Sequence, residues 1–310
     1  MKKISIVIPT YNEEENVEPL SKEIVAVFEN KLAYLDYEII FIDNYSKDST
    51  REVIKRICAE NPKIKAIFNA RNFGHIRSPF YAITQTDSDA SILMCADFQD
   101  PVAMIVDFVK EWENGYKIVI GIKHKSKENK LMYFFRSAYY KIIKKAAEVE
   151  QIEHFTGFGL YDRAFVDVLR ELDDPMPYMR GIVAELGFER KEINYEQLKR
   201  RAGKTKNNWY TLYDIGMIGI TSYSKIIMRL ATIFGFIFSG ISMFVALAYL
   251  ILKLMFWDRF PAGTAPILIG VFLFGSLQLF FIGFLGEYIL NINSRVMKRP
   301  LVIEEKRINF

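Results

Sequence analysis

Three side chains that could bind a metal ion or move a proton, Asp97, Gln99 and Asp100, follow directly after a short apolar run at 91–95. An apolar run that ends in acidic residues is typical of a buried parallel strand that delivers carboxylates to its C-terminal end. Open α/β sheets bind their ligands at that edge. Carboxylate and amide oxygens suit Mg²⁺ or Mn²⁺, ions that usually neutralise phosphates. The pattern therefore indicates an enzyme that handles a nucleotide or a nucleotide sugar with a divalent metal.

Polar side chains also follow two earlier apolar runs. The run 4–9 ends in Pro9 and is followed by Tyr11 and Glu13, and the run 37–43 ends in Asp43. Because the C-terminal ends of parallel strands meet at one edge, we expect these side chains to converge with Asp97 on a single crevice. Taken singly, Asp43 and Asp97 are equally well explained as helix caps.

Strand and helix patterns alternate through the first 122 residues. Strands are predicted at 4–9, 37–43, 63–69, 91–96 and 117–122, and helices after Asn12, after Ser49, at 78–85 and at 101–113. Asn12 is the predicted cap of the first helix. Alternating βα units predict an α/β fold with a doubly wound, mainly parallel sheet covered by helices on both faces.

Composition excludes some classes of protein. A net charge of +4 over 310 residues does not indicate a nucleic-acid partner. The two cysteines, Cys58 and Cys95, form no CxxC pair, so neither a zinc site nor a disulfide framework is indicated.

The C-terminal third contains two long uncharged runs, 230–252 and 260–286, the second most apolar at 267–285. We expect two membrane-spanning helices within 228–290, since about 20 apolar residues cross a bilayer; two buried core helices are the alternative. Residues 130–147 and 208–227 are expected to form amphipathic helices at the membrane surface, although 130–147 suits an ordinary surface helix equally well. The positive-inside rule then places a catalytic domain, 1–207, and a tail, 291–310, in the cytoplasm. This predicts a multi-pass protein of the bacterial cytoplasmic (inner) membrane, with the lipid bilayer as a partner.

An ordered set of motifs adds a resemblance to a known family. The set comprises 7–13, Asp43 with 46–50, 71–74, 97–101, 160–163, Arg180 with Gly181, and 200–206. The chain resembles the family 2 glycosyltransferases of GT-A fold, in the branch of dolichol-phosphate mannose synthase and the bacterial bactoprenol glucosyltransferases. The resemblance covers about residues 4–206, and bacterial members also carry two C-terminal membrane spans.

The resemblance implies a role for each matching residue. Asp97 and Gln99 would hold Mg²⁺ or Mn²⁺ at the donor diphosphate, and Arg200 and Lys206 would meet phosphate charge on the acceptor or leaving group. The nucleotide, most simply that of a UDP-sugar, would lie against Pro9, Tyr11, Glu13, Asp43, Asn72 and Gly74. The acceptor would be a polyprenyl phosphate, and a homo-oligomer is possible.

The chain departs from the family pattern at four places. Where the family usually has Asp-Asp-Gly-Ser, this chain has Asp43 followed by Asn44, Tyr45 and Ser46. Cys95 replaces the first Asp of the Asp-x-Asp signature. An acidic residue is replaced by Gly157, and the first arginine of the basic loop by Gln197. Cys95 is either a soft, poor ligand for Mg²⁺ or a plain core thiol, and we favour the core thiol.

The glycine at 157 bears on the acceptor. A sugar hydroxyl needs a general base, whereas a polyprenyl phosphate arrives largely ionised and needs none. We therefore predict an inverting transfer of a hexose to undecaprenyl phosphate. Two alternatives stay open: transfer to a sugar hydroxyl of a lipid-linked glycan, with Asp100, Asp162 or Glu185 as base, and a catalytically silent membrane scaffold that binds nucleotide.

Overall fold

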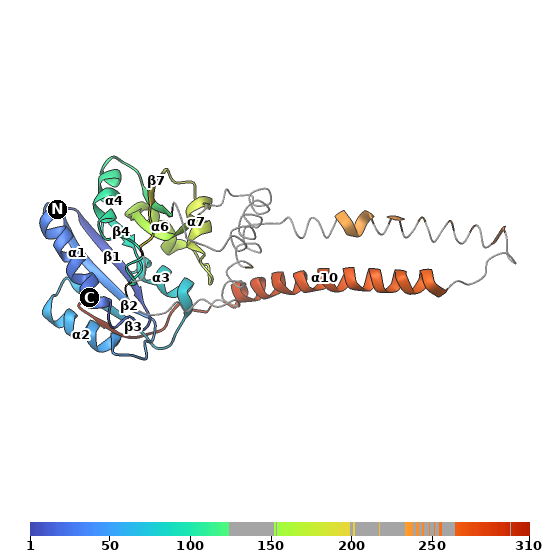
Figure 1. Ribbon diagram of the computed structural model, residues 1–310, viewed down its shortest axis with the longest axis horizontal. Helices are drawn as coiled ribbons and strands as arrows, with labels where there is room; N and C mark the ends of the chain where they lie inside the picture. The colour runs from blue at the N-terminus through green and yellow to red at the C-terminus, as the bar shows by residue number, and fades with distance from the viewer. Residues whose placement is uncertain are drawn as a thin grey trace.

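The computed structural model describes residues 1–123, 152, 154–198, 201, 264–297 and 299–310, with isolated residues between 217 and 255. Its main feature is a mixed sheet flanked by helices (Figure 1), and the strand order in this sheet is β7-β5-β6-β4-β1-β2-β3-β8. The strands are β1 (Lys3–Thr10), β2 (Asp36–Asp43), β3 (Ile64–Asn69), β4 (Ala90–Leu93), β5 (Ile118–Lys123), β6 (Phe155–Asp162), β7 (Arg190–Tyr195) and β8 (Glu304–Ile308). The predicted α/β fold class is confirmed.

Helices cover both faces of this sheet. The helices that do so are α1 (Val17–Lys31), α2 (Thr50–Glu60), α3 (Gly74–Thr84), α4 (Met104–Glu113), α6 (Arg163–Glu171) and α7 (Met179–Glu185), whereas α10 (Thr264–Val296) does not cover the sheet. One apolar core joins α1, α2 and α4 to alternate strand residues such as Ile6 and Phe41. A second core joins α3, α6 and α7 to the opposite residues, such as Val7 and Ile40. The strands therefore read as continuous apolar runs because both of their faces are buried.

The centre of the sheet is parallel, as predicted. β4, β1, β2 and β3 pair in parallel, and the register places Thr10 opposite Asp43. The end of β4, where the chain continues to Asp97, lies on the other side of β1. The three predicted polar clusters therefore do meet at one edge.

Among the outer strands, the sequence patterns predicted β5, at 117–122, but not β6, β7 or β8. β6 lies between β4 and β5 and pairs antiparallel with both, so the predicted βα alternation ends with β5. The segment predicted as a free tail returns to the sheet, where β8 pairs antiparallel with β3. β8 is anchored by side chains, among them Glu305, which binds Arg51 at 2.7 Å. This pairing covers an edge strand that would otherwise expose backbone groups.

The first helix also begins later than predicted. α1 starts at Val17, and Asn12 does not cap it, because Asn12 has a left-handed φ of 55°. Its Oδ1 accepts instead from the Lys47 N–H at 2.7 Å. Asn12 therefore joins the loop after β1 to the loop after β2.

Gly159 in β6 provides a test of the sheet packing. A Cβ at this position would lie 2.6 Å from the carbonyl oxygen of Val119 in β5, which is far inside van der Waals contact. We expect Gly159→Ala to lower the free energy of unfolding by about 1–3 kcal/mol, measured by urea titration. Gly270→Ala is the matched control, because a Cβ there meets no atom within 4 Å; an equal loss in both variants would contradict the backbone clash.

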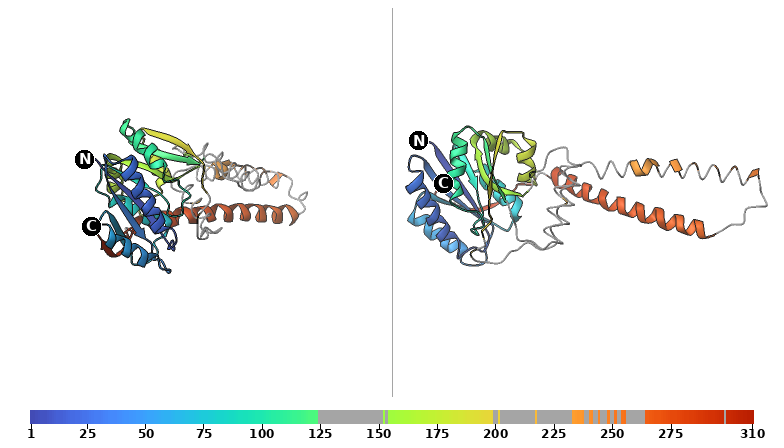
Figure 2. Two further views of the ribbon diagram at one scale, coloured as in Figure 1. Left: turned by 60° about the vertical axis from the view of Figure 1, so that its left-hand side comes forward. Right: turned by 45° about the horizontal axis from the view of Figure 1, so that its top comes forward.

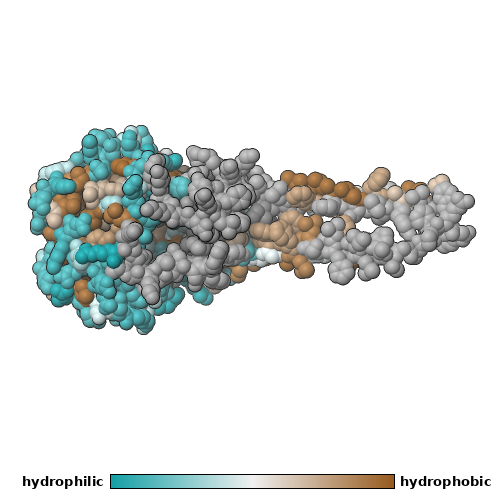
Figure 3. Space-filling view, in the orientation of Figure 1, coloured by the Kyte–Doolittle hydropathy of each residue, from teal (hydrophilic) through white to brown (hydrophobic). Residues whose placement is uncertain are grey.

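α10 extends away from the sheet domain (Figures 1 and 2). Apolar side chains along it are exposed, such as Val271 at 63%, Leu279 at 71% and Phe280 at 58% (Figure 3). A crossing of the bilayer needs a helix with about 20 predominantly apolar residues. Among the described residues, no helix meets the length and apolarity that a crossing requires. This finding overturns the predicted location as a multi-pass protein of the inner membrane, and the two predicted spans in 228–290 are not confirmed. The predicted surface helix 130–147 lies outside the described residues, as does nearly all of 208–227.

Candidate active site

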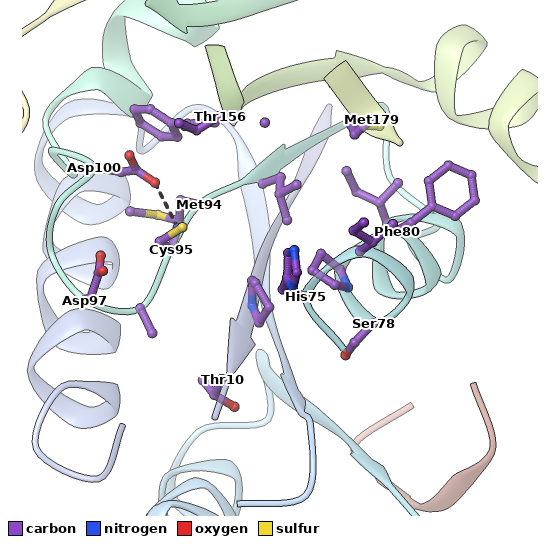
Figure 4. A pocket seen from close by; sticks show the side chains of 18 of the residues that line it. Thr10, His75, Ser78, Phe80, Met94, Cys95, Asp97, Asp100, Thr156 and Met179 are labelled. Atoms are coloured by element: carbon purple, nitrogen blue, oxygen red, sulfur yellow. Dashed lines mark hydrogen bonds between the residues drawn. The ribbon is translucent and has the colours of Figure 1, made fainter. Parts of the chain in front are cut away.

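A cavity of about 450 Å³ opens where β1, β2 and β4 end. Figure 4 shows Cys95, Asp97 and Asp100 on one wall and His75, Ser78 and Phe80 of α3 on the opposite wall. The predicted site residues that line this cavity are Pro9, Tyr11, Glu13, Gly74, Asp97, Gln99 and Asp100. Asp43 and Asn72 do not line it, and Arg200 and Lys206 lie outside the described residues.

Asp97 is held in a tight turn after β4. Its Oδ1 accepts the Gln99 N–H at 3.1 Å, and the residue between them, Phe98, has a left-handed φ of 60°. A bulky residue with such a φ is strained unless the surroundings enforce it, which is a common feature of ligand sites. The turn brings Asp97 and Gln99 to the same cavity wall.

Asp100 fixes the shape of that turn. Its Oδ2 accepts the Cys95 N–H at 3.0 Å and its Oδ1 accepts the Tyr195 hydroxyl at 2.9 Å. Burial raises the pKa of Asp100. Because both carboxylate oxygens are engaged, this geometry favours a structural role for Asp100 over that of a general base.

Cys95 is exposed at the cavity wall, whereas we predicted a core thiol. Burial of its surroundings and the neighbouring Asp100 and Asp97 raise the pKa of the thiol well above its usual range. Sulfur is a soft ligand and therefore a poor one for a hard cation such as Mg²⁺. The side chains of this wall that could hold Mg²⁺ or Mn²⁺ are the carboxylate of Asp97 and the amide oxygen of Gln99, and Mg²⁺ commonly completes such a set with phosphate oxygens and water.

Asp43 is fully buried behind the cavity. Its Oδ2 accepts the N–H groups of Tyr45 and Ser46, both at 3.1 Å, and lies 3.3 Å from Nε of Arg51. Burial raises the pKa of Asp43, and these contacts oppose that shift. Asp43 thus shapes the turn that leads to the cavity, and the predicted contact with base or ribose stays a prediction.

Comparison with known proteins identifies the family. The family model described as glycosyl transferase family 2 matches residues 5–170. The chain belongs to this family. It is 32% identical over 306 residues to the putative glycosyltransferase CsbB of Bacillus subtilis (strain 168), covering 98% of this chain and 92% of that protein. It is 30% identical over 302 residues to the prophage bactoprenol glucosyl transferase homolog of Escherichia coli (strain K12), covering 97% and 98%.

Solved structures also match the chain. Glucosyl-3-phosphoglycerate synthase from Mycobacterium tuberculosis, in complex with Mn²⁺, UDP and phosphoglyceric acid, matches with a TM-score of 0.46 and 16% identity. The match covers 71% of this chain and 76% of that one. Because the TM-score is below 0.5, the assignment rests on the sequence matches. The protein is a glycosyltransferase, and the alternative of a silent scaffold is not retained.

Two cations of this family 2 glycosyltransferase complete the described cavity wall. Lys123, at the end of β5, was not predicted, and Arg180 was noted only as part of a motif. Burial lowers the pKa of Lys123, whereas the charges of Asp100 and Asp97 act in the opposite direction. Lys123 could not be singled out from the sequence. It ends an apolar strand and is followed closely by Lys125 and Lys127, so its position in the sequence does not distinguish it from an ordinary surface lysine.

The other candidate bases in the family 2 enzyme lie elsewhere. Asp162 caps α6 through the Ala164 N–H and also accepts the indole N–H of Trp112 at 2.7 Å. Glu185 is exposed at the end of α7. Neither lines the described cavity.

Proposed function

We propose that this glycosyltransferase moves a hexose from a UDP-sugar to a polyprenyl phosphate, most simply undecaprenyl phosphate, with inversion at the anomeric carbon and with Mg²⁺ or Mn²⁺ bound. Relatives named bactoprenol glucosyl transferase support the acceptor class. The observation that carries the proposal is one cavity that combines Asp97 with two cations, Lys123 and Arg180, beside Gly157.

Gly157 occupies the position where the family pattern has an acid. Its φ of +102° lies in the region that side-chain-bearing residues rarely adopt, and its carbonyl accepts the Tyr161 hydroxyl at 2.7 Å. An anionic acceptor removes the need for a base at this position and adds a need for cations. The described cavity has a glycine at position 157 and two cations, Lys123 and Arg180, which supports an anionic acceptor.

Each of these cavity residues would then have its own role in the reaction. Asp97 and Gln99 would hold the metal, which when bound would offset the charge that develops on the departing nucleoside diphosphate. Lys123 and Arg180 bind and orient the acceptor phosphate. One of its ionised oxygens attacks the anomeric carbon, the bond to the diphosphate breaks on the opposite face, and an α-linked donor gives a β-linked product.

Incubation of the purified full-length protein with radiolabelled UDP-sugars, Mg²⁺ and undecaprenyl phosphate tests this proposal. We expect an organic-soluble labelled product. We also expect the rate to fall on the acid side near the second pKa of the acceptor phosphate, about 6, because protonation converts the dianion into the less nucleophilic monoanion. Efficient transfer to a neutral glycan hydroxyl, with no product on undecaprenyl phosphate, would contradict the proposal.

A further inference from the structure

Asn44, at the end of β2, uses every hydrogen-bonding position of its side chain. Its Nδ2 donates to the Asn72 Oδ1 at 3.0 Å and to the Gly74 carbonyl at 3.1 Å. Its Oδ1 accepts the Phe73 N–H at 2.8 Å and the Asn69 Nδ2 at 3.1 Å. The residue is buried and still contributes to the cavity wall.

The orientation of this amide is set by backbone groups. An N–H can only donate and a carbonyl can only accept, so Phe73 requires the oxygen of Asn44 and Gly74 requires its nitrogen. A carboxylate at position 44 would keep the first contact and lose the second. An amide at position 44, unlike a carboxylate, can therefore make both of the contacts that hold the loop 70–74 in this conformation.

Asn72 completes the arrangement from the other side of Gly74. Its Oδ1 accepts the Gly74 N–H at 2.8 Å as well as the Asn44 Nδ2. Both the N–H and the carbonyl of Gly74 are thus held by asparagine side chains, while its φ of +88° suits glycine. The backbone N–H of Asn44 is itself fixed, donating to the Thr10 carbonyl at 2.9 Å.

We propose that Asn44 and Asn72 form a clasp that positions Gly74 and His75 as the cavity wall against which the nucleotide sugar binds. Asn44 is a positioning residue in this inference, which rests on the proposed function for the identity of the ligand. It gives the departure from the family pattern at position 44 a role, since the donated hydrogen bonds need an amide.

Donor kinetics and local hydrogen exchange of Asn44→Ala test the clasp. Loss of the four bonds frees the loop, so the KM for the UDP-sugar should rise about tenfold or more, while kcat at saturating donor stays within about threefold. Amide exchange should accelerate in 70–78 and stay unchanged elsewhere in the sheet. Asn61→Ala is the matched control. The Asn61 Oδ1 accepts the Lys63 N–H in the turn before β3, so this variant should leave the donor KM unaltered.

Asn72→Ala is the second variant, because Asn72 is exposed and its loss does not threaten folding. We expect the same changes at smaller amplitude. An unaltered donor KM in both variants would overturn the clasp, as would weaker donor binding without faster exchange in 70–78, which would indicate a direct contact instead. If the wild-type protein bound no UDP-sugar, the proposed function would fail, and the exchange experiment would still decide whether the clasp exists.

Discussion

Replacement of Asp97 by asparagine should abolish sugar transfer, with kcat/KM falling by about 10³-fold or more. Asp97 is the carboxylate that the turn after β4 presents to the cavity together with Gln99. A neutral amide cannot offset the charge of a divalent metal, so the leaving diphosphate would lose its main stabilisation. The fold should be retained, because the asparagine Oδ1 can still accept the Gln99 N–H. Initial rates at saturating Mg²⁺, with circular dichroism as a check of folding, measure both effects.

Cys95→Ala is the control for this experiment. Because soft sulfur is a poor ligand for Mg²⁺, we expect this variant to keep most of the activity. Chelation of divalent cations with EDTA should abolish the transfer activity of the wild-type protein, and addition of Mg²⁺ or Mn²⁺ should restore that activity. If Cys95→Ala were as inactive as Asp97→Asn, the sulfur would belong to the metal site and our assignment of ligands would be wrong.

Replacement of Lys123 by methionine should lower kcat/KM for the acceptor by about 10²-fold. Methionine keeps the apolar stem and removes the charge, so the change isolates the ammonium group. Burial already lowers the pKa of Lys123, and a partly desolvated cation interacts more strongly with a phosphate than an exposed one does. Lys123→Arg should recover part of the loss because it restores the charge. Steady-state kinetics with undecaprenyl phosphate as the varied substrate measure the effect.

The matched control is Lys117→Met, just before the other end of β5, where the side chain pairs with Asp162 at 3.1 Å. That site lies outside the described cavity, so acceptor kinetics should stay near the wild-type values. A loss of donor affinity in Lys123→Met, with the acceptor KM unchanged, would place Lys123 on the donor side and contradict its proposed role.

Much of the central sheet was predictable from the sequence. β1 to β4 are buried on both faces, so local apolar runs and the turns after them were sufficient to locate the strands. Of the outer strands, β5 was predicted in the same way, at 117–122, whereas β6, β7 and β8 were not. β8 has the sequence Glu-Glu-Lys-Arg-Ile, which carries no strand signal, and its pairing with β3 depends on a chain return from residue 296.

Some features of the candidate site could likewise be predicted from the sequence, and others could not. Asp97 and Gln99 were found because they follow a buried strand at a recognisable spacing. The roles of Asp100 and Cys95 depend on partners far along the chain, such as Tyr195, which is 95 residues from Asp100. The engagement of Asp100 and the exposure of Cys95 were therefore visible only in the folded protein.

The sequence by itself determined the family, the α/β class and the edge of the sheet where the cavity opens, because each follows from short-range patterns of burial and motif order. Only the tertiary structure decided which neighbours surround each polar group. It buried Asp43 behind the cavity, engaged Asp100, brought Lys123 and Arg180 to the same wall and joined Asn44 to Gly74. Hydrogen-bond partners and pKa shifts depend on distances of a few ångströms between residues that lie tens of positions apart in the chain, and those distances exist only once the sheet has formed.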